Sequence, residues 1–485
     1  MTIRVLQVSA EIFPLLKTGG LADVAGALPA ALHAHGADVR VLLPGFAPVL
    51  DALPDSEVVA ELVAPWGEKA QLRKGRLTGL SLMAYVLDAP ALYVRDGGPY
   101  EDAQRRPFKD NHRRFAFLGW AGAQIASGAD REWAAQVVHC HDWHAGLAAA
   151  YLALSGRRPA GVASVYTVHN LAYQGLFSQA QFSELGLPTS AFALQGLEFH
   201  GQMSFMKAGL FYANHITTVS PTYAREIQSP EQGCGLDGLL RERSDALTGI
   251  LNGVDEAVWN PAQDPALPCV FDAHNTRGKA LCKKDLQQAM GLQVNNKALL
   301  FGVVSRLTEQ KGLHLVLEVA ETLVSRGGQL MVLGSGEPEL ERSFVQLARS
   351  HPQSVAVQIG YDEQRAHQLF GASDVTLVPS RFEPCGLTQM YGLKYGSLPL
   401  VHRVGGLADT VVDASLEDLD SGKTNGFVFQ PFTADALRAA ISRAFALYAR
   451  PALWRAVRQR AMQQELGWRH SAAQYLRVYK SLVSP

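Results

Sequence analysis

Short apolar runs rich in β-branched residues alternate along this chain with longer segments of helical pattern. Residues 3–9 (IRVLQVS) are followed by a glycine-containing loop, the helical pattern LADVAGALPAALHAHG and the apolar run VRVLLPG. A strand, a helix and a second strand in this order form a βαβ unit. The alternation recurs at residues 135–155, 163–169 and 216–220. Such uniformly apolar strands predict a largely parallel sheet that is covered on both faces.

A second series of the same units begins near residue 298, with the predicted strands ALLFGVVSRL, QLMVLGSG, VAVQIGY and DVTLVPS. Residues 245–265, between the two series, are rich in Gly, Asn and Pro, so we expect the domain boundary there. We therefore predict an α/β protein with two doubly wound, Rossmann-like domains, residues 1–250 and 251–485, that face a central cleft. The second domain ends in a helical tail, whose last segment WRHSAAQYLRVYKSL fits against either domain.

The composition argues against several classes of partner. Lys plus Arg (44) nearly cancel Asp plus Glu (45), so no overall field attracts nucleic acid or an anionic membrane. No run of about 18 apolar residues could span a membrane, and the first residues lack the basic start and long apolar core of a signal peptide. The five cysteines lack CxxC spacing, which favours neither a zinc knuckle nor a disulfide framework and predicts a cytoplasmic protein.

The loop after the first strand, EIFPLLKTGG, leads directly into a helical pattern. It places Lys17, Gly19 and Gly20 at a helix N-terminus, where backbone N–H groups and one cation can bind a diphosphate. Glycine before a helix is also ordinary turn chemistry, so the loop by itself supports either interpretation.

Several long motifs follow one another in the chain: KTGGLADVAGALP, VVHCHDWHAG, YTVHNLAYQG, TVSPTYAREI, SRLTEQKG and SRFEPCGLTQMYGLKYGSLPLVHRVGGLADTV. Through them the chain resembles the bacterial glycogen and plant starch synthases over nearly its whole length. The resemblance implies a GT-B fold and transfer of glucose from ADP-glucose to the non-reducing end of an α-1,4-glucan such as glycogen. It further implies retention of configuration, no metal and no other cofactor. The first domain would bind the acceptor and the second the nucleotide sugar.

The loop between the predicted strand DVTLVPS and the next helix carries Glu383. A carboxylate at such a crossing can accept hydrogen bonds from sugar hydroxyls, and the N–H groups of Gly386 and Leu387 can act as donors beside it. By resemblance Glu383 contacts the donor glucose, and the same substrate site includes Cys385, Gly386, Leu387 and Thr388. A single loop glutamate is otherwise commonly a solvated charge or a helix cap.

One position departs from the pattern of many related retaining transferases, which carry a second glutamate eight residues after the first. Here that position is Tyr391. An aromatic residue after EPCGLTQ is also usual among the glycogen and starch synthases. Glu383 is then the only carboxylate of the pair, and no role is carried over to residue 391.

Arg306 and Lys311 lie on a loop that follows the predicted strand LLFGVVS and enters a helix. Cleavage of the glycosyl bond leaves negative charge on the departing diphosphate. Fixed cations stabilise this charge more in the transition state than before it, which accelerates the reaction. Surface cations are often only solubilising, but the resemblance assigns this pair to the phosphates.

The motif VVHCHDWH places His139, His141, Asp142 and His144 at the end of one strand. Such a cluster suggests a metal site, but histidine and aspartate also gather where a strand end faces a cleft. The resemblance instead places Asp142 close to the reacting sugar. It also matches His169, in YTVHN, to the family histidine that meets the donor sugar near its 6-hydroxyl; a lone histidine is more often a packed core residue.

Three further assignments rest on position and resemblance. Asn252, which we assign to the substrate site, and Asp255 lie in the expected interdomain hinge GILNGVD, where a simple Asn-Gly turn is the alternative, above all for Asp255. Tyr361 follows a predicted strand and could stack on the adenine base. Gly405 and Gly406 precede a helix and could add N–H donors for the diphosphate.

Two other functions remain open from the residues. A glucan phosphorylase shares the two-domain architecture but needs pyridoxal phosphate on a lysine. A catalytically silent glucan-binding protein is the second alternative, and the combination of Lys17, Arg306, Lys311 and Glu383 disfavours it. A retaining hydrolase would need two carboxylates about 5 to 5.5 Å apart, and no such pair stands out in the sequence.

Overall fold

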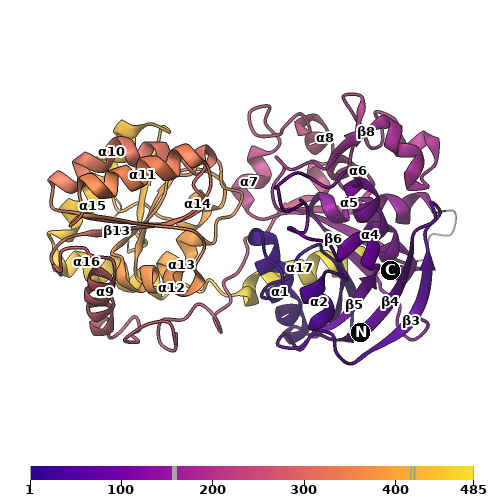
Figure 1. The fold of residues 1–485 in the computed structure, drawn as a ribbon, viewed down its shortest axis with the longest axis horizontal. Helices are drawn as coiled ribbons and strands as arrows, with labels where there is room; N and C mark the ends of the chain where they lie inside the picture. Colours follow the sequence, from indigo (N-terminus) through magenta and orange to yellow (C-terminus); the bar gives the residue numbers. More distant parts are fainter. Residues whose placement is uncertain (1, 156–160, 416–417, 419–421, 484–485) are drawn as a thin grey trace. The chain divides into compact units, whose positions relative to one another are not determined.

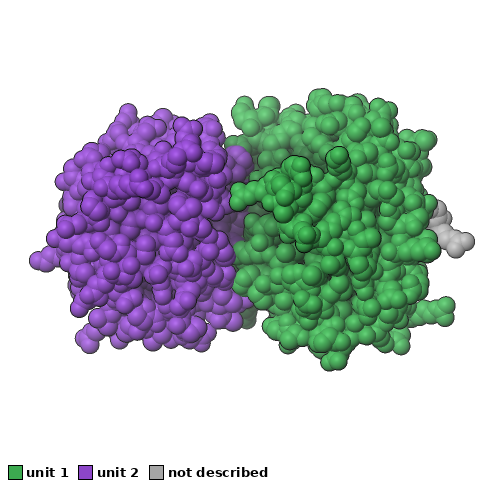
Figure 2. All heavy atoms as spheres, viewed as in Figure 1, with its two compact units in different colours: residues 1–253, 468–485 green, residues 254–467 purple. Residues whose placement is uncertain are grey.

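The computed structural model describes residues 2–155, 161–415, 418 and 422–483. The chain forms two compact units, which are described separately here and coloured green and purple in Figure 2. Unit 1 comprises Met1–Gly253 and Trp468–Pro485, and unit 2 comprises Val254–Gly467.

Unit 1 is built on a nine-stranded sheet with the order β12-β11-β7-β6-β1-β2-β5-β4-β3. Neighbours from β12 to β5 are parallel, and β4 is antiparallel to both β5 and β3. The strands are β1 (Arg4–Val8), β2 (Asp38–Pro44), β3 (Ser56–Val63), β4 (Lys69–Arg76), β5 (Met83–Asp88), β6 (Val137–His141), β7 (Ala163–Val168), β11 (His215–Thr218) and β12 (Leu247–Gly249). The predicted parallel sheet is confirmed, whereas the hairpin β3–β4 is not predicted, because its strands at the sheet edge mix charged with apolar residues.

Helices cover both faces of this sheet, because successive side chains of a strand point to opposite faces. Val5 of β1 joins a core cluster with α1 and α17, whereas Val8 lies against Gly122 of α4, where an added Cβ would be 3.1 Å from Val8 Cγ2. The helices are α1 (Gly20–Ala34), α2 (Ala47–Asp51), α3 (Pro90–Tyr93), α4 (Asn111–Ala126), α5 (Asp142–Leu154), α6 (Phe205–Tyr212), α7 (Pro221–Glu226), α8 (Asp237–Glu242) and α17 (Trp468–Val483), with 3-10 turns η1 (Gln179–Leu185), η2 (Thr189–Ala191) and η3 (Ser244–Ala246).

The last helix, α17, packs in unit 1. Figure 1 shows it in yellow beside the indigo α1. Trp468, Tyr475 and Tyr479 of α17 are buried in the same cluster as the first strands, and Ser471 Oγ donates a hydrogen bond of 2.5 Å to the carbonyl of Leu251. The structure therefore corrects the expected division at the C-terminus, which placed the tail with residues 251–485. An amphipathic pattern predicts that a helix packs on a core but not on which one.

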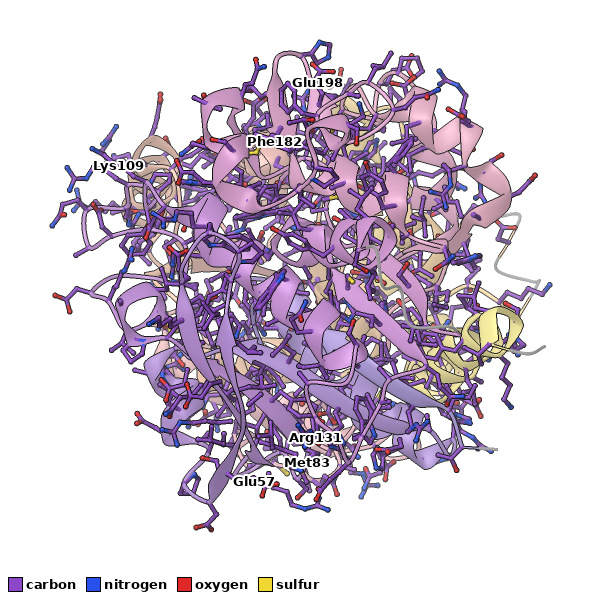
Figure 3. All side chains as sticks on the ribbon, turned by 90° about the vertical axis from the view of Figure 1, so that its right-hand side faces the viewer. Glu57, Met83, Lys109, Arg131, Phe182 and Glu198 are labelled. Atoms are coloured by element: carbon purple, nitrogen blue, oxygen red, sulfur yellow. The ribbon has the colours of Figure 1, made fainter. Side chains whose placement is uncertain are left out.

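A small antiparallel sheet is inserted between β7 and α6, with the order β8-β10-β9. Its strands are β8 (Leu176–Ser178), β9 (Glu198–Phe199) and β10 (Gln202–Ser204). Figure 3 shows Phe182 and Glu198 of this insert at one end of unit 1, and Met83 and Arg131 at the opposite end. Met83 begins β5 and Arg131 precedes β6, so the insert lies at the end that carries the carboxyl ends of the parallel strands.

Unit 2 is built on a six-stranded parallel sheet with the order β15-β14-β13-β16-β17-β18. The strands are β13 (Leu300–Val304), β14 (Gln329–Gly334), β15 (Val355–Ile359), β16 (Val375–Val378), β17 (Leu398–His402) and β18 (Phe427–Phe429). The helices are α9 (Arg277–Ala289), η4 (Glu309–Lys311), α10 (Leu313–Ser325), α11 (Pro338–Ser350), α12 (Glu363–Ala372), α13 (Thr388–Lys394), α14 (Gly405–Thr410), α15 (Ala434–Tyr448) and α16 (Pro451–Met462). The predicted second doubly wound domain is confirmed. In the part of the chain that the structure describes, no helix is both long and apolar enough to cross a membrane.

Among the parallel strands of each sheet, there is one point where the chain reverses its direction of progress across the sheet. In unit 1 this point lies between β1 and β6, and in unit 2 between β13 and β16. The loops that leave neighbouring strands there turn to opposite faces of the sheet and leave a crevice at the strand ends, which is where such folds bind ligands. These two pairs of loops are therefore the places to look for a site in each unit.

Candidate active site

In unit 2 the loops after β13 and β16 hold Lys311 and Glu383 against each other. Lys311 Nζ lies 2.5 Å from Glu383 Oε2, and Ser380 Oγ donates to the same oxygen at 2.9 Å. The loops are also joined through their backbones, because the N–H of Arg381 donates to the carbonyl of Gln310 at 2.8 Å. Glu383 is 8% exposed. The switch point of unit 2 thus carries a nearly buried carboxylate beside a cation.

The two predicted phosphate-binding cations differ in their surroundings. The Lys311 ammonium has three donors, so it can pair with Glu383 and still donate to an anionic ligand. Arg306 lies on the exposed part of the same loop, and its guanidinium makes no hydrogen bond within the described residues. The structure brings Lys311, but not Arg306, into contact with Glu383.

The Glu383 loop rests on the first turn of α14. The N–H of Gly406 donates to the carbonyls of Glu383 (3.2 Å) and Pro384 (3.1 Å). Gly405 has a φ of +42°, and a Cβ there would lie 1.9 Å from the Glu383 carbonyl oxygen. The N–H of Gly406, predicted as a diphosphate donor, thus donates to these two carbonyls in the structure and supports the Glu383 loop.

Gln389, which the sequence did not single out, fixes the other side of this loop. Its Nε2 donates to the carbonyls of Cys385 at 3.0 Å and Gly386 at 2.8 Å. Leu387 caps α13, which begins at Thr388, so the N–H groups predicted as donors lie at a helix start, where they lack helical partners. A buried glutamine within the apolar pattern LTQMYGL was the signal that could have identified it.

Tyr391, at the position of the second glutamate, is a packing residue. Its ring stacks on that of Trp259 with centroids 3.8 Å apart and an interplanar angle of 10°. Trp259 in turn stacks on His367 at the same distance. A glutamate here would bury its carboxylate among aromatic rings, so the departure is explained by this stack.

Tyr361 lies between β15 and α12 and is 69% exposed. Its hydroxyl donates to Glu363 Oε2 at 2.6 Å, which orients the ring. The structure therefore places the predicted base-stacking residue after β15, which is separated from β13 by β14 in the sheet.

In unit 1 the loop after β1 is held by Glu11, which the sequence did not single out as a site residue. Glu11 is buried and accepts hydrogen bonds from the N–H (2.6 Å) and hydroxyl (2.5 Å) of Thr18 and from the hydroxyl of Tyr100. Lys17 pairs with Asp23 at 2.8 Å on the exposed side of the loop. A buried acid directly after an apolar strand was the available signal.

The KTGG glycines form the entry to α1, as predicted. Gly19 is the N-cap residue, in an extended conformation with a φ of −162°, and α1 begins at Gly20. Both glycines are exposed, together with Lys17. The first N–H groups of a helix lack intrahelical partners, so this turn can donate to an anion.

Asp142 and His169 follow the adjacent strands β6 and β7, and the structure brings them together. Asp142 Oδ1 accepts the backbone N–H groups of His169 (2.8 Å) and Asn170 (3.4 Å). Asp142 has a φ of +54°, in the left-handed region that strains residues other than glycine. Burial raises the pKa of its carboxyl to about 7 in spite of these two donors.

The neighbouring histidines form hydrogen bonds with protein groups. His139 contacts Thr167 Oγ1 through Nε2 (2.5 Å) and the Tyr479 hydroxyl through Nδ1 (2.8 Å), and His141 Nδ1 lies 3.0 Å from His169 Nε2. Within the described residues, no group of three or more His, Cys, Asp and Glu is placed to hold a metal ion. Of the cluster that suggested a metal site, His139 and His141 thus bond to protein groups, whereas both ring nitrogens of His144 are buried without a hydrogen-bond partner among the described residues.

These buried histidines make the stability of unit 1 sensitive to acid. Burial lowers the pKa of His139 and His169 to about 3, and that of His141 and His144 well below its usual value. Below a pH of about 6.5, unfolded histidines bind protons that the folded ones do not. Each buried histidine therefore lowers the unfolding free energy by about 1.4 kcal/mol for every unit by which the pH falls. Asp142 acts in the opposite sense between a pH of about 4 and 7, offsetting one histidine.

We therefore expect the unfolding free energy of unit 1 to fall steeply between a pH of about 6.5 and 5. Guanidinium titrations at several pH values, followed by tryptophan fluorescence, measure it. In His139→Gln the slope with pH should be shallower, because one buried histidine is removed. Equal unfolding free energies at both ends of this range would contradict the prediction.

The two hinge residues fall in different units. Asn252 belongs to unit 1, and its side-chain Oδ1 is buried without a hydrogen-bond partner among the described residues. Asp255 belongs to unit 2, where its carboxylate accepts the N–H of Ala257 at 3.0 Å in a local turn. The structure thus favours the simple-turn alternative for Asp255 and leaves Asn252 as the ligand-binding candidate.

Comparisons with known proteins agree with this arrangement. Residues 4–242 match the family described as "Starch synthase catalytic domain", and residues 287–459 match "Glycosyl transferases group 1". The protein named glycogen synthase from Variovorax paradoxus (strain S110) is 60% identical over 99% of both chains. That from Leptothrix cholodnii is 58% identical over 99% of this chain and 100% of its own.

Solved structures show the same fold. The catalytic domain of starch synthase IV from Arabidopsis thaliana, bound to ADP and acarbose, covers 100% of both chains with 30% identity and a TM-score of 0.90. Sucrose-phosphate synthase from Thermosynechococcus elongatus, at 18% identity and a TM-score of 0.60 over 99% of both chains, is similar in fold alone. The predicted GT-B fold with two Rossmann-like domains is confirmed. With relatives at this identity over nearly the whole length, the chain belongs to the glycogen synthase family of glycosyltransferases.

Proposed function

We propose that this chain transfers glucose from ADP-glucose to the non-reducing end of an α-1,4-glucan, with retention of configuration. The contact between Lys311 and Glu383 at the switch point of unit 2 carries the proposal. It joins a phosphate-binding cation to a carboxylate that accepts from sugar hydroxyls, as a nucleotide-sugar site requires. The relatives named glycogen synthase and the starch synthase structure with ADP and acarbose support the same substrates.

The site must mainly stabilise the negative charge that develops on the departing diphosphate. As the bond between glucose C1 and the diphosphate oxygen breaks, an electron pair stays on that oxygen. Lys311 and Arg306 stabilise it in unit 2, and Lys17 with the N–H groups of Gly19 and Gly20 offers a second anion site in unit 1. Fixed positive side chains thereby supply the charge that a metal ion would otherwise bring to the phosphates.

The acceptor 4-hydroxyl attacks C1 from the face that the diphosphate leaves. Its proton passes to the departing diphosphate, while the new C1–O4 bond forms. Glu383 in unit 2 holds hydroxyls of the donor glucose, and Asp142 with His169 in unit 1 holds sugar hydroxyls. Because Tyr391 occupies the place of a second glutamate, a double displacement through two carboxylates is disfavoured.

The test of this function is the release of ADP from ADP-glucose in the presence of glycogen. We expect glycogen-dependent release, and much slower turnover of UDP-glucose at equal concentration. Phosphate-dependent formation of glucose 1-phosphate, with absorbance from a bound cofactor, would instead identify a phosphorylase. No turnover of either donor would leave a glucan-binding protein as the function.

Tyr361→Ala tests whether this tyrosine stacks on the base. Loss of one base–aromatic contact should raise the KM for ADP-glucose about tenfold with kcat within about twofold. Tyr361→Phe is the matched control, because it keeps the ring and removes only the hydrogen bond to Glu363. An unchanged KM in Tyr361→Ala would refute the stacking.

The remaining expectations concern the surroundings of the enzyme. A cytoplasmic location and the absence of nucleic-acid or membrane partners stay predictions, which rest on the free cysteines and the balanced charge.

A further inference from the structure

Three histidine rings lie in a row at the ends of β6 and β7 in unit 1. The centroids of His139 and His141 are 4.2 Å apart, and those of His141 and His169 are 5.2 Å apart. His139 and His141 are fully buried, whereas His169 is 9% exposed. His169 is therefore the least buried residue of this row, and the other two rings determine how it is held.

The contact between the rings of His141 and His169 is one hydrogen bond with one shared hydrogen. His141 Nδ1 lies 3.0 Å from His169 Nε2. Burial lowers the pKa of both rings far enough that both are neutral near pH 7. A neutral imidazole has one N–H donor and one acceptor nitrogen, so one of the two rings donates and the other accepts.

The other nitrogen of His141 decides which ring donates. His141 Nε2 is buried and has no hydrogen-bond partner among the described residues. If the hydrogen were on Nε2, a buried N–H would be left without an acceptor. If it is on Nδ1, Nε2 is only an unfilled acceptor, and buried structures tolerate unfilled acceptors better than orphaned donors.

We propose that His141 donates its Nδ1–H to Nε2 of His169 and thereby fixes His169 as the tautomer that carries its hydrogen on Nδ1. His169 then offers a neutral Nδ1–H, which can donate to a sugar hydroxyl oxygen. Because its Nε2 lone pair already accepts from His141, the ring has no free lone pair with which to remove a proton. His141 is a positioning residue, since it acts through His169. The effect on turnover rests on the proposed function of His169; the tautomer itself does not.

The tautomer can be measured without any activity. Long-range 1H–15N correlation spectra of the full chain, labelled with 15N-histidine, distinguish protonated from bare ring nitrogens, and His169→Gln identifies the signals of His169. We expect a protonated Nδ1 and a bare Nε2. A protonated Nε2 on His169 would overturn the proposal, whatever the enzyme's activity.

Kinetics then separate positioning from general core stability. His141→Asn keeps an N–H donor near the place of Nδ1, and His141→Leu has nearly the same size without a donor. His141→Leu should lower kcat about tenfold, the size of effect expected for the loss of one orienting hydrogen bond. His141→Asn should keep most of the parent kcat. Tyr479→Phe, which removes a buried hydrogen bond from the neighbouring His139, should leave kcat and the His169 signals unchanged.

The outcomes are distinct. Equal kcat in the asparagine and leucine variants would overturn the positioning role. If His169→Gln itself retained normal turnover, the proposed contact of His169 with substrate would fail, while the tautomer would still stand or fall by the spectra.

Discussion

Glu383→Gln is expected to lower kcat about a thousandfold with little change in the KM for ADP-glucose, the loss typical of one preorganised charge at a reacting centre. The amide keeps the shape of the side chain but removes the negative charge that pairs with Lys311 at 2.5 Å. Lys311→Ala should lower kcat about a hundredfold or more, because the departing diphosphate loses a fixed cation. Initial rates of ADP release at saturating glycogen measure both.

The double variant sharpens this prediction. Because the two side chains act as one unit, their effects on kcat should not add, and the double variant should resemble the worse single variant. Glu309→Gln is the matched control: Glu309 lies on the Lys311 loop, and its exposed carboxylate pairs, among the described residues, with Arg381 at the surface. A Glu383→Gln enzyme with a kcat within about threefold of the parent would refute the assigned role.

Gly406→Ala is expected to abolish most activity without unfolding unit 2. A Cβ at this position would lie 2.2 Å from the carbonyl oxygen and 2.5 Å from the Cα of Cys385. Both atoms belong to the backbone, so the Glu383 loop must move, and a displacement of about 1 Å at a catalytic group costs about a hundredfold in rate. We expect kcat to fall by at least this factor, measured by ADP release.

Thermal unfolding and a control variant separate a shifted loop from a lost fold. Gly406→Ala should retain a cooperative thermal unfolding transition, because the added Cβ clashes with the Cys385 backbone in the Glu383 loop and not with the core of the sheet. Gly238→Ala, on helix α8 of unit 1, adds a Cβ whose nearest neighbour is a flexible Arg241 end 4.0 Å away, and it should keep full activity. Parent-like kcat in Gly406→Ala would show that the loop tolerates displacement.

The parallel strands of both units are predictable because each is buried on both faces and reads as a continuous apolar run. The sequence also predicts Lys311 and Glu383 as a cation and a carboxylate at strand ends. It does not predict their contact, because they are 72 residues apart and meet only when β13 and β16 pair. Neighbourhood in a sheet is a property of strand order, which local pattern does not encode.

Two residues that hold the loops of the candidate site, Glu11 and Gln389, were not predicted from the sequence. Glu11 and Gln389 are buried polar groups whose partners include backbone N–H and carbonyl groups, and the sequence does not show where backbone groups will lie. The same limit applies to Gly406. The sequence predicts its N–H as a diphosphate donor at a helix start, and it does not show that the fold brings the Glu383 carbonyl to this N–H.

The return of α17 to unit 1 has a consequence for the order in which the protein folds during its synthesis. Unit 2 is one continuous stretch, Val254–Gly467, and all of it leaves the ribosome before Trp468. Unit 1 begins earlier but lacks Trp468, Tyr475 and Tyr479 of its core until α17 has been made. The half that is translated first is therefore completed last, and until then the apolar face that α17 covers is open to chaperones and to aggregation.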